Sequence, residues 1–208
     1  RYQLDHVVMV AADNATAAAV RADGTLVLWG ANGNGQLGYG QIGTDADSKV
    51  APMLTRANSY YLEETSLTYD AYLRGVVDVD VSDQSTLALL REHLTTAEDG
   101  TVTDQGRNLL GWGLNTSGEL GLAAGTDSAA LPTLVNQVWK TIGEYAMNFT
   151  AHGSRAFVTT NADHLYGTGV NGTTYNALAQ GQSVGNVDTF TQLRKFDDSG
   201  NRGLTDVY

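Results

Sequence analysis

The sequence predicts an all-β fold: a β-propeller with blades of about four antiparallel strands, of which this chain holds three and the start of a fourth. A ten-residue phrase occurs twice, as WGANGNGQLG at residues 29–38 and as WGLNTSGELG at residues 112–121. Between these phrases the apolar runs are short, have the composition of strands, and end in Gly, Asn or Asp. A period of about 50 to 70 residues with such runs is typical of propeller blades.

A weaker third copy of the phrase extends the repeat. Residues 168–179 keep Gly169, Asn171 and Leu178, but they lack the tryptophan and hold two extra residues. The recurrences therefore predict one propeller segment over the whole chain, with repeat units at about 5–74, 75–143 and 144–202 and with 203–208 opening a fourth.

Each unit is expected to consist of strands. Residues 15–22 have helical propensity because they are rich in alanine, but their place in the repeat predicts a strand of small side chains near a crowded axis. Residues 25–28 have the length and composition of a strand. In residues 77–81 valine and aspartate alternate, which points one face of a strand inward and the other toward water.

The repeated phrase contains residues that suit turns and close packing. The pairs Asn32-Gly33 and Asn34-Gly35 favour positive φ and tight turns. The glycine after each tryptophan predicts a close approach of neighbouring backbone. The tryptophans are interpreted as packing residues between blades, with ligand stacking as the alternative. The structural repeat residues are Trp29, Gly30, Asn32, Gly38, Trp112, Gly113, Asn115, Gly121, Gly169 and Asn171.

These motifs resemble the repeats of the regulator of chromosome condensation (RCC1-type) family, whose unit runs through Asp-Gly, a short strand, Trp-Gly-x-Asn, Gly-Gln-Leu-Gly and a later Pro. The first unit shows them in that order, as Asp23-Gly24, residues 29–32, residues 35–38 and Pro52. The resemblance covers nearly the whole chain and weakens toward the C-terminus. It implies a β-propeller that is part of a ring of typically seven blades.

The chain also departs from the family pattern. The family's usual His-Ser pair is missing, with Ala, Thr and Ala at 15–17 and Ser and Thr at 85–86, and insertions lengthen the first two units. Nucleotide exchange on a small GTPase is the best-known activity of the family. The matching motifs are structural ones, so they do not imply that activity here.

Composition limits the classes of partner. With 42% hydrophobic and 17% charged residues, the chain is globular, and no run approaches the roughly 18 apolar residues of a membrane span. A formal charge of −11 argues against nucleic-acid binding, which requires a surface of Lys and Arg. The absence of cysteine and the low content of Lys and Arg favour an extracellular, cell-surface or virion protein over a cytoplasmic one.

No arrangement of residues in the sequence predicts catalysis. The four histidines are scattered, and there is no HExxH motif, no cysteine and no Gly-x-Ser-x-Gly elbow. Asp78, Asp80 and Asp83 lack the central Gly and distal Glu of a calcium loop and are interpreted as solvated carboxylates. We therefore expect no catalytic residue, no metal site and no cofactor.

Two insertions are the candidate contact sites for a partner. The first, between residues 57 and 74, is rich in tyrosine, which is favoured at interfaces; the alternative is a loop whose tyrosines fold back on the blade. The second, within residues 91–108, is expected to be an exposed loop or an extended hairpin. The candidate partner-binding residues are Tyr60, Tyr61, Tyr69, Tyr72, Glu92 and His93.

The sequence thus favours a non-enzymatic propeller module that serves as a structural or protein-binding part of a larger assembly, such as a surface appendage or a virion. An incomplete ring leaves strand edges and blade flanks to be covered. The expected partners are other protein subunits, in a homo- or hetero-oligomer, or the rest of the same polypeptide. The alternatives are a guanine-nucleotide exchange factor or signalling scaffold, and a carbohydrate-binding module that uses tyrosine or tryptophan platforms.

Overall fold

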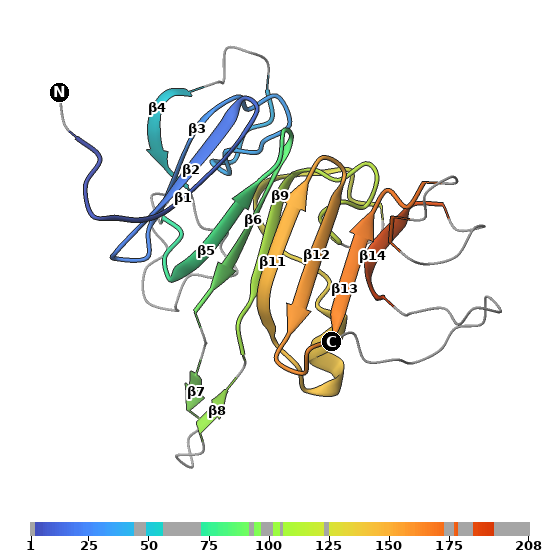
Figure 1. Ribbon diagram of the computed structural model, residues 1–208. Coiled ribbons are helices and arrows are strands. Elements are labelled where there is room, and N and C mark those ends of the chain that lie inside the picture. The colour runs from blue at the N-terminus through green and yellow to red at the C-terminus, as the bar shows by residue number, and fades with distance from the viewer. Residues whose placement is uncertain are drawn as a thin grey trace.

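A computed structural model of the chain describes residues 3–43, 49–55, 72–91, 94–96, 102–104, 106–122, 125–172, 177–178 and 185–193. These residues form three four-stranded antiparallel sheets and one two-stranded hairpin (Figure 1). The predicted all-β propeller fold class is confirmed.

The first sheet follows the order of the chain and contains β1 (Val7–Asp13), β2 (Thr16–Arg21), β3 (Leu26–Gly30) and β4 (Lys49–Leu54). The alanine-rich segment is the second strand, as its place in the repeat predicts. Ala18 and Ala19 are buried on opposite faces of this strand, so small side chains fit where both faces are covered. Tertiary packing here overrides the helical propensity of alanine.

The second sheet holds β5 (Val76–Val81), β6 (Ser85–Leu90), β9 (Leu109–Leu114) and β10 (Ser128–Leu134). The predicted alternation in β5 holds for residues 78–81, because Val79 and Val81 are buried while Asp78 and Asp80 are partly exposed. It is wrong at Val77, which is 44% exposed because the register of β5 shifts between Val76 and Asp78. The short strands β7 (Leu94–Thr96) and β8 (Val102–Asp104) pair with each other between β6 and β9. They lie inside the second insertion, for which the sequence predicts either an exposed loop or an extended hairpin. The pairing of β7 with β8 is that of a hairpin.

The third sheet follows a short 3₁₀ helix, η3 (Val138–Ile142), and contains β11 (Ala146–His152), β12 (Arg155–Thr160), β13 (Leu165–Gly169) and β14 (Val187–Gln192). The three sheets therefore span residues 7–54, 76–134 and 146–192. The unit boundaries at 74, 143 and 202 stay a prediction, and residues 203–208 lie outside the described residues.

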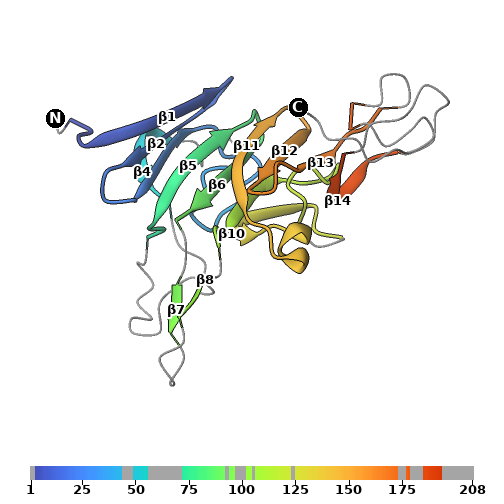
Figure 2. The same ribbon diagram turned by 60° about the horizontal axis from the view of Figure 1, so that its bottom comes forward.

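The sheets lie side by side as blades, with their first strands β1, β5 and β11 adjacent to one another (Figures 1 and 2). Two apolar clusters fill the spaces between them. One joins the first and second sheets around Leu28, Leu37 and Trp112, and the other joins the second and third sheets around Trp139 and Phe190. Burial of these side chains is what holds the blades together.

Candidate protein-binding surfaces

The strand register defines equivalent positions in the three sheets. Gly30 pairs with Thr16, Gly113 pairs with Ser85, and Gly169 pairs with Arg155. The residue before each of these glycines is Trp29, Trp112 or Thr168. The third unit therefore carries a threonine at the position of the repeated tryptophan.

The three glycines share one backbone conformation and one close contact. Their φ angles are +107° at Gly30, +100° at Gly113 and +101° at Gly169. A Cβ at these positions would overlap the carbonyl oxygens of Ala15, Gln84 and Ser154, respectively. The close approach that the sequence predicts at Gly30 and Gly113 is confirmed, and it leaves no room for another residue type.

The repeat asparagines close the loop that follows. The side-chain oxygen of Asn32 accepts a hydrogen bond from the Leu37 N–H at 3.0 Å, and that of Asn115 accepts one from the Leu120 N–H at 2.8 Å. Asn171 does the same for Leu178 at 3.0 Å, although the third loop has two extra residues. All three asparagines are buried, so these bonds satisfy groups that water cannot reach.

One detail of the predicted turns is wrong. Gly35 adopts φ of +83°, as an Asn-Gly turn requires, but Gly33 does not adopt a left-handed conformation. The reason is that the Asn32 side chain, held between Leu37 N–H and the Gln41 carbonyl, already reverses the chain.

Each loop packs against the sheet that follows it. Gly38 lies so close to the Trp112 indole that a Cβ there would be 2.7 Å from Nε1, and Gly121 is packed in the same way against Phe190. The Trp112 Nε1–H donates to the Gln36 carbonyl oxygen at 2.9 Å, and the Thr168 hydroxyl donates to that of Gly118 at 2.6 Å. These hydrogen bonds tie adjacent blades together.

The tryptophan of the first unit differs from that of the second. Trp112 is fully buried between two sheets, whereas Trp29 is half-buried. The sequence presents the two tryptophans as equivalent, and only the arrangement of the sheets distinguishes them.

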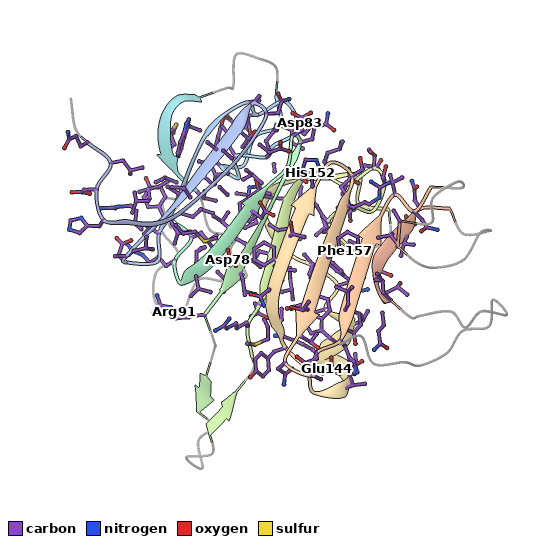
Figure 3. All side chains as sticks on the ribbon, viewed as in Figure 1. Asp78, Asp83, Arg91, Glu144, His152 and Phe157 are labelled. Carbon is purple, nitrogen blue, oxygen red and sulfur yellow. The ribbon has the colours of Figure 1, made fainter. Side chains whose placement is uncertain are left out.

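The turns between the first two strands of each sheet meet at one end of the propeller, where Figure 3 labels Asp83 and His152. The Asn14 amide donates to Asp83 Oδ1 at 2.5 Å, and the Asp80 carboxylate accepts hydrogen bonds from Thr150 Oγ1 and the Ala151 N–H. These contacts join the second sheet to both of its neighbours. Asp80 and Asp83 are therefore contact residues between sheets.

Asp78 has an unusual environment for a carboxylate. Burial raises its pKa above the ordinary 3.8, and the nearby Asp80 raises it further, while the Val79 N–H and Arg107 act in the opposite direction. Desolvation is the largest of these effects because a half-buried carboxylate loses part of its hydration.

A buried carboxylate also lies in the third blade. Glu144 accepts a hydrogen bond from the Thr160 hydroxyl at 2.6 Å and lies 2.7 Å from His164 Nδ1. Burial raises the pKa of Tyr166 above 10.0, and Glu144 adds to that rise. These contacts fasten the segment after η3 to the β12–β13 turn, which is a structural role.

The hairpin formed by β7 and β8 extends away from the three sheets (Figures 1 and 2). Its strands pair through Leu94 with Asp104, Thr95 with Thr103, and Thr96 with Val102. Because β6 and β9 pair directly with each other, the second sheet is complete without this hairpin. Of the candidate partner-binding residues, Tyr72 is exposed, and Tyr60, Tyr61, Tyr69, Glu92 and His93 lie outside the described residues.

Two other kinds of site are absent from the described residues. No three His, Asp or Glu side chains in these parts of the chain converge as metal ligands would. None of the helical segments described is long and apolar enough to cross a bilayer.

Several solved structures share this fold. Human WBSCR16 is similar with a TM-score of 0.64 and 15% identity over 91% of this chain and 40% of its own. Prp20p of Saccharomyces cerevisiae, characterised with its binding to Gsp1p and histones, has a TM-score of 0.64 and 18% identity over 92% of this chain and 39% of its own. Yeast RCC1 (Prp20) bound to Kap60 has a TM-score of 0.60 and 15% identity over 95% and 40%.

The chain thus spans about two fifths of the length of these neighbours. No protein-family model and no curated protein matches the sequence. The three sheets, the repeated glycine contacts and the structural neighbours agree: the protein has an RCC1-like β-propeller fold.

Proposed function

We propose that this protein is a non-enzymatic β-propeller module that binds other proteins as part of a larger assembly, and that the β7–β8 hairpin is its contact element. The single observation behind this proposal is a two-stranded hairpin that extends from a sheet which is complete without it. A lone two-stranded hairpin is marginally stable in water, and its outer edges expose unpaired backbone groups. A partner strand added to such an edge supplies the missing hydrogen bonds.

Charge favours a basic surface on the partner. The chain carries a formal charge of −11 and has a pI of about 4.5. Complementary charge accelerates association and makes it sensitive to salt. The similar fold of Prp20p, which was studied for binding to Gsp1p and histones, supports a protein partner. Other subunits, in a homo- or hetero-oligomer, or further parts of the same polypeptide are the proposed partners.

The proposed setting is extracellular, on a cell surface or in a virion. Its support is compositional, namely the absence of cysteine and the low content of Lys and Arg. Intact-mass analysis of the natural particle tests this proposal. Recovery of the natural polypeptide in a secreted, cell-surface or virion fraction is the expected result, and recovery of a free cytoplasmic polypeptide would contradict it.

The hairpin is tested by deletion. A variant in which residues 94–104 are replaced by a short Gly-Ser turn should keep its melting temperature, because the β6–β9 pairing is untouched. Partners identified by crosslinking and mass spectrometry are purified, and their affinity for the variant should fall by about tenfold or more. Ile142→Ala, at an exposed site on η3, is the matched control. Equal affinity for the deletion variant and the parent would overturn the assignment.

A second candidate function is nucleotide exchange on a small GTPase, which the likeness to Prp20p favours. This function requires the purified chain to accelerate nucleotide release from a small GTPase. Unchanged release rates across a panel of such proteins would remove it.

A further inference from the structure

The β7–β8 hairpin continues the ladder formed by β6 and β9. Leu89 pairs with Leu109 in the sheet. Leu94 pairs with Asp104 in the hairpin, so segments of equal length join the two pairs on either side. The hairpin therefore keeps the register of the sheet. Because a two-stranded hairpin by itself is marginally stable in water, the contacts at its base decide how firmly it is held.

One side of this base is tied by hydrogen bonds to η3 and to the residue before it. The Lys140 Nζ donates to Asn108 Oδ1 at 2.6 Å, and the Gln137 side-chain amide donates to the same oxygen at 3.2 Å. The Gln137 Oε1 accepts a hydrogen bond from the Leu109 N–H at 3.0 Å. Gln137 is only 9% exposed, so water competes poorly for these partners.

Packing reinforces the same side of the base. Gly106 follows β8, is buried, and has a φ of +64°. A Cβ added to Gly106 would lie 2.8 Å from the Tyr145 Cβ. Tyr145 directly precedes β11, so the backbone that leaves the hairpin is packed against the start of the third sheet.

The other side of the base lies against the first sheet. Arg91 directly follows β6 and is labelled in Figure 3, where β6 leads into the hairpin. Its backbone N–H donates to the Gly75 carbonyl at 2.8 Å, and the Val76 N–H donates to the Gly24 carbonyl at 3.1 Å. Gly24 belongs to the β2–β3 turn. The Arg91 side chain covers both glycines, because a Cβ at Gly75 would lie 3.1 Å from its Nε and one at Gly24 would lie 3.0 Å from its Nη2.

We infer that Asn108, Gln137 and Lys140 are positioning residues that hold the β7–β8 hairpin in one fixed direction. The hairpin is thus a rigid arm, braced by the first sheet on one side and by η3 and the third sheet on the other. A contact element that already has its binding geometry loses little conformational freedom when a partner binds, which raises affinity. The inference deepens the proposed function and rests on it for this gain in affinity, whereas the fixed direction of the hairpin does not depend on it.

Pulsed EPR distances test the direction of the hairpin in the full chain. The sequence has no cysteine, so introduced cysteines alone take the spin labels. Thr95→Cys on β7 is paired with Val8→Cys on β1 or with Met147→Cys on β11, two exposed positions on the first and third sheets. We expect one narrow distance distribution for each pair. Broad distributions in the otherwise unchanged chain would overturn the inference.

Amide hydrogen exchange measures how strongly the base holds the hairpin. Asn108→Ala removes the acceptor of both Lys140 and Gln137, so exchange at residues 94–96 and 102–104 should become faster by about tenfold or more. Thr141→Val is the matched control, because the Thr141 hydroxyl donates to the Val138 carbonyl within η3 and makes no bond to the base. Its exchange rates at the hairpin should equal those of the parent. Equal acceleration in the two variants would overturn the role assigned to Asn108.

Lys140 provides a second test if Asn108→Ala proves to be unfolded by circular dichroism. Lys140→Met keeps an unbranched side chain but removes the donor, so exchange at the hairpin should become faster by about fivefold or more and both distance distributions should broaden. Lys140→Arg keeps a charged donor and should restore slow exchange. Parent-like exchange in Lys140→Met would overturn the role assigned to Lys140.

These measurements need no partner, so failure of this inference and failure of the proposed function are distinguishable. Narrow distance distributions, together with unchanged partner affinity after deletion of residues 94–104, would leave the positioning intact and overturn the proposed function. Broad distributions together with a loss of affinity would do the reverse. Where both hold, Lys140→Met should weaken binding of the partner purified after crosslinking by about fivefold, and unchanged affinity would contradict the gain assigned to a fixed direction.

Discussion

At Gly113 the backbone adopts φ of +100° and passes so close to Gln84 that a side chain would overlap its carbonyl oxygen. Gly30 and Gly169 repeat this arrangement against Ala15 and Ser154. The residue type is fixed twice, once by the left-handed conformation and once by the lack of space. For this reason the glycine is retained in the third unit, although the neighbouring tryptophan is replaced by Thr168.

Substitution of Gly113 by alanine separates the energetic cost of the left-handed backbone conformation from the cost of the steric overlap. Gly113→Ala should lower the free energy of unfolding by about 3 kcal/mol or more, because strain in the backbone adds to the steric overlap. Gly143→Ala is the control, since Gly143 has φ of +81° but a Cβ added there would meet no atom within 4 Å. It should cost only about 1–2 kcal/mol. Equal losses in urea unfolding would mean that the contact with Gln84 carries no energy.

Asp78 should make the stability of the fold depend on pH, and the sign of this dependence follows from its raised pKa. Below pH 3.8 the carboxyl is protonated in both the folded and the unfolded chain, and it carries no penalty. As pH rises, the folded chain must ionise a half-buried group, so stability falls. Asp78→Asn should therefore be more stable than the parent at pH 7, and the difference should vanish in acid.

Asp23 is the matched control with the opposite sign. The Thr25 hydroxyl and N–H donate to it and lower its pKa, with Arg21 adding to the effect. Its contribution to stability is present above pH 3.8 and is lost as pH falls through the lowered pKa. Asp23→Asn should therefore destabilise the chain at pH 7. Unfolding curves in which both variants shift in the same direction would contradict the opposite signs assigned to the two carboxylates.

The loop after the third strand is the element that joins neighbouring blades. Its asparagine fixes the loop from within, and its carbonyls accept hydrogen bonds from the following sheet. Asn115 makes two hydrogen bonds within its loop, accepting one from the Leu120 N–H at 2.8 Å and donating one to the Thr126 carbonyl at 2.6 Å. Gly118 of the same loop accepts the hydrogen bond from Thr168 of the third sheet. Loss of this residue should therefore affect a contact between sheets as well as the loop.

Asn115→Ala should cost about 2–3 kcal/mol, because it leaves the buried Leu120 N–H without an acceptor. Asn34→Ala is the control, since this residue follows Asn32 in the same kind of loop and its backbone N–H, which remains, makes the bond to Gln36. That variant should change stability by less than about 0.5 kcal/mol. Thermal unfolding measures both, and similar melting temperatures would exclude the proposed role of Asn115.

The sequence alone predicts several of the strands. The alanine-rich strand β2 follows from its place in the repeat, and β5 follows from its alternation of valine and aspartate. The inserted hairpin is less determined, because polar residues without a period are compatible with a loop or with strands. The tyrosine-rich insertion lies mostly outside the described residues, so its role as a contact site stays a prediction.

For the molecule as a whole, two separate clusters imply two separately stabilised interfaces. Phe190 contacts Trp139 with ring centroids 5.3 Å apart and belongs to the cluster between the second and third sheets. Leu28 belongs to the cluster between the first and second. In arrays of repeats, stability is approximately a sum over units and nearest-neighbour interfaces.

Phe190→Ala should cost about 3–5 kcal/mol and should reduce amide exchange protection mainly in β12 and β13. Leu28→Ala should cost about 2–5 kcal/mol and should reduce protection mainly in β2 and β3. Hydrogen exchange with mass spectrometry distinguishes the two patterns. Uniform loss of protection over all three sheets in both variants would show a single cooperative unit instead.

The sequence by itself determined the repeat, the strand composition and the positions that must be glycine or asparagine. These features are local, since a left-handed φ or a loop-closing amide imposes a residue type at one position. Only the tertiary structure decided which surfaces are covered. Val10 and Val79 have the same side chain and the same place in a strand, as Trp29 and Trp112 do in the repeated phrase. Burial of Val79 and Trp112 comes from packing against a sheet that is distant in sequence, and residue type alone does not record such a contact.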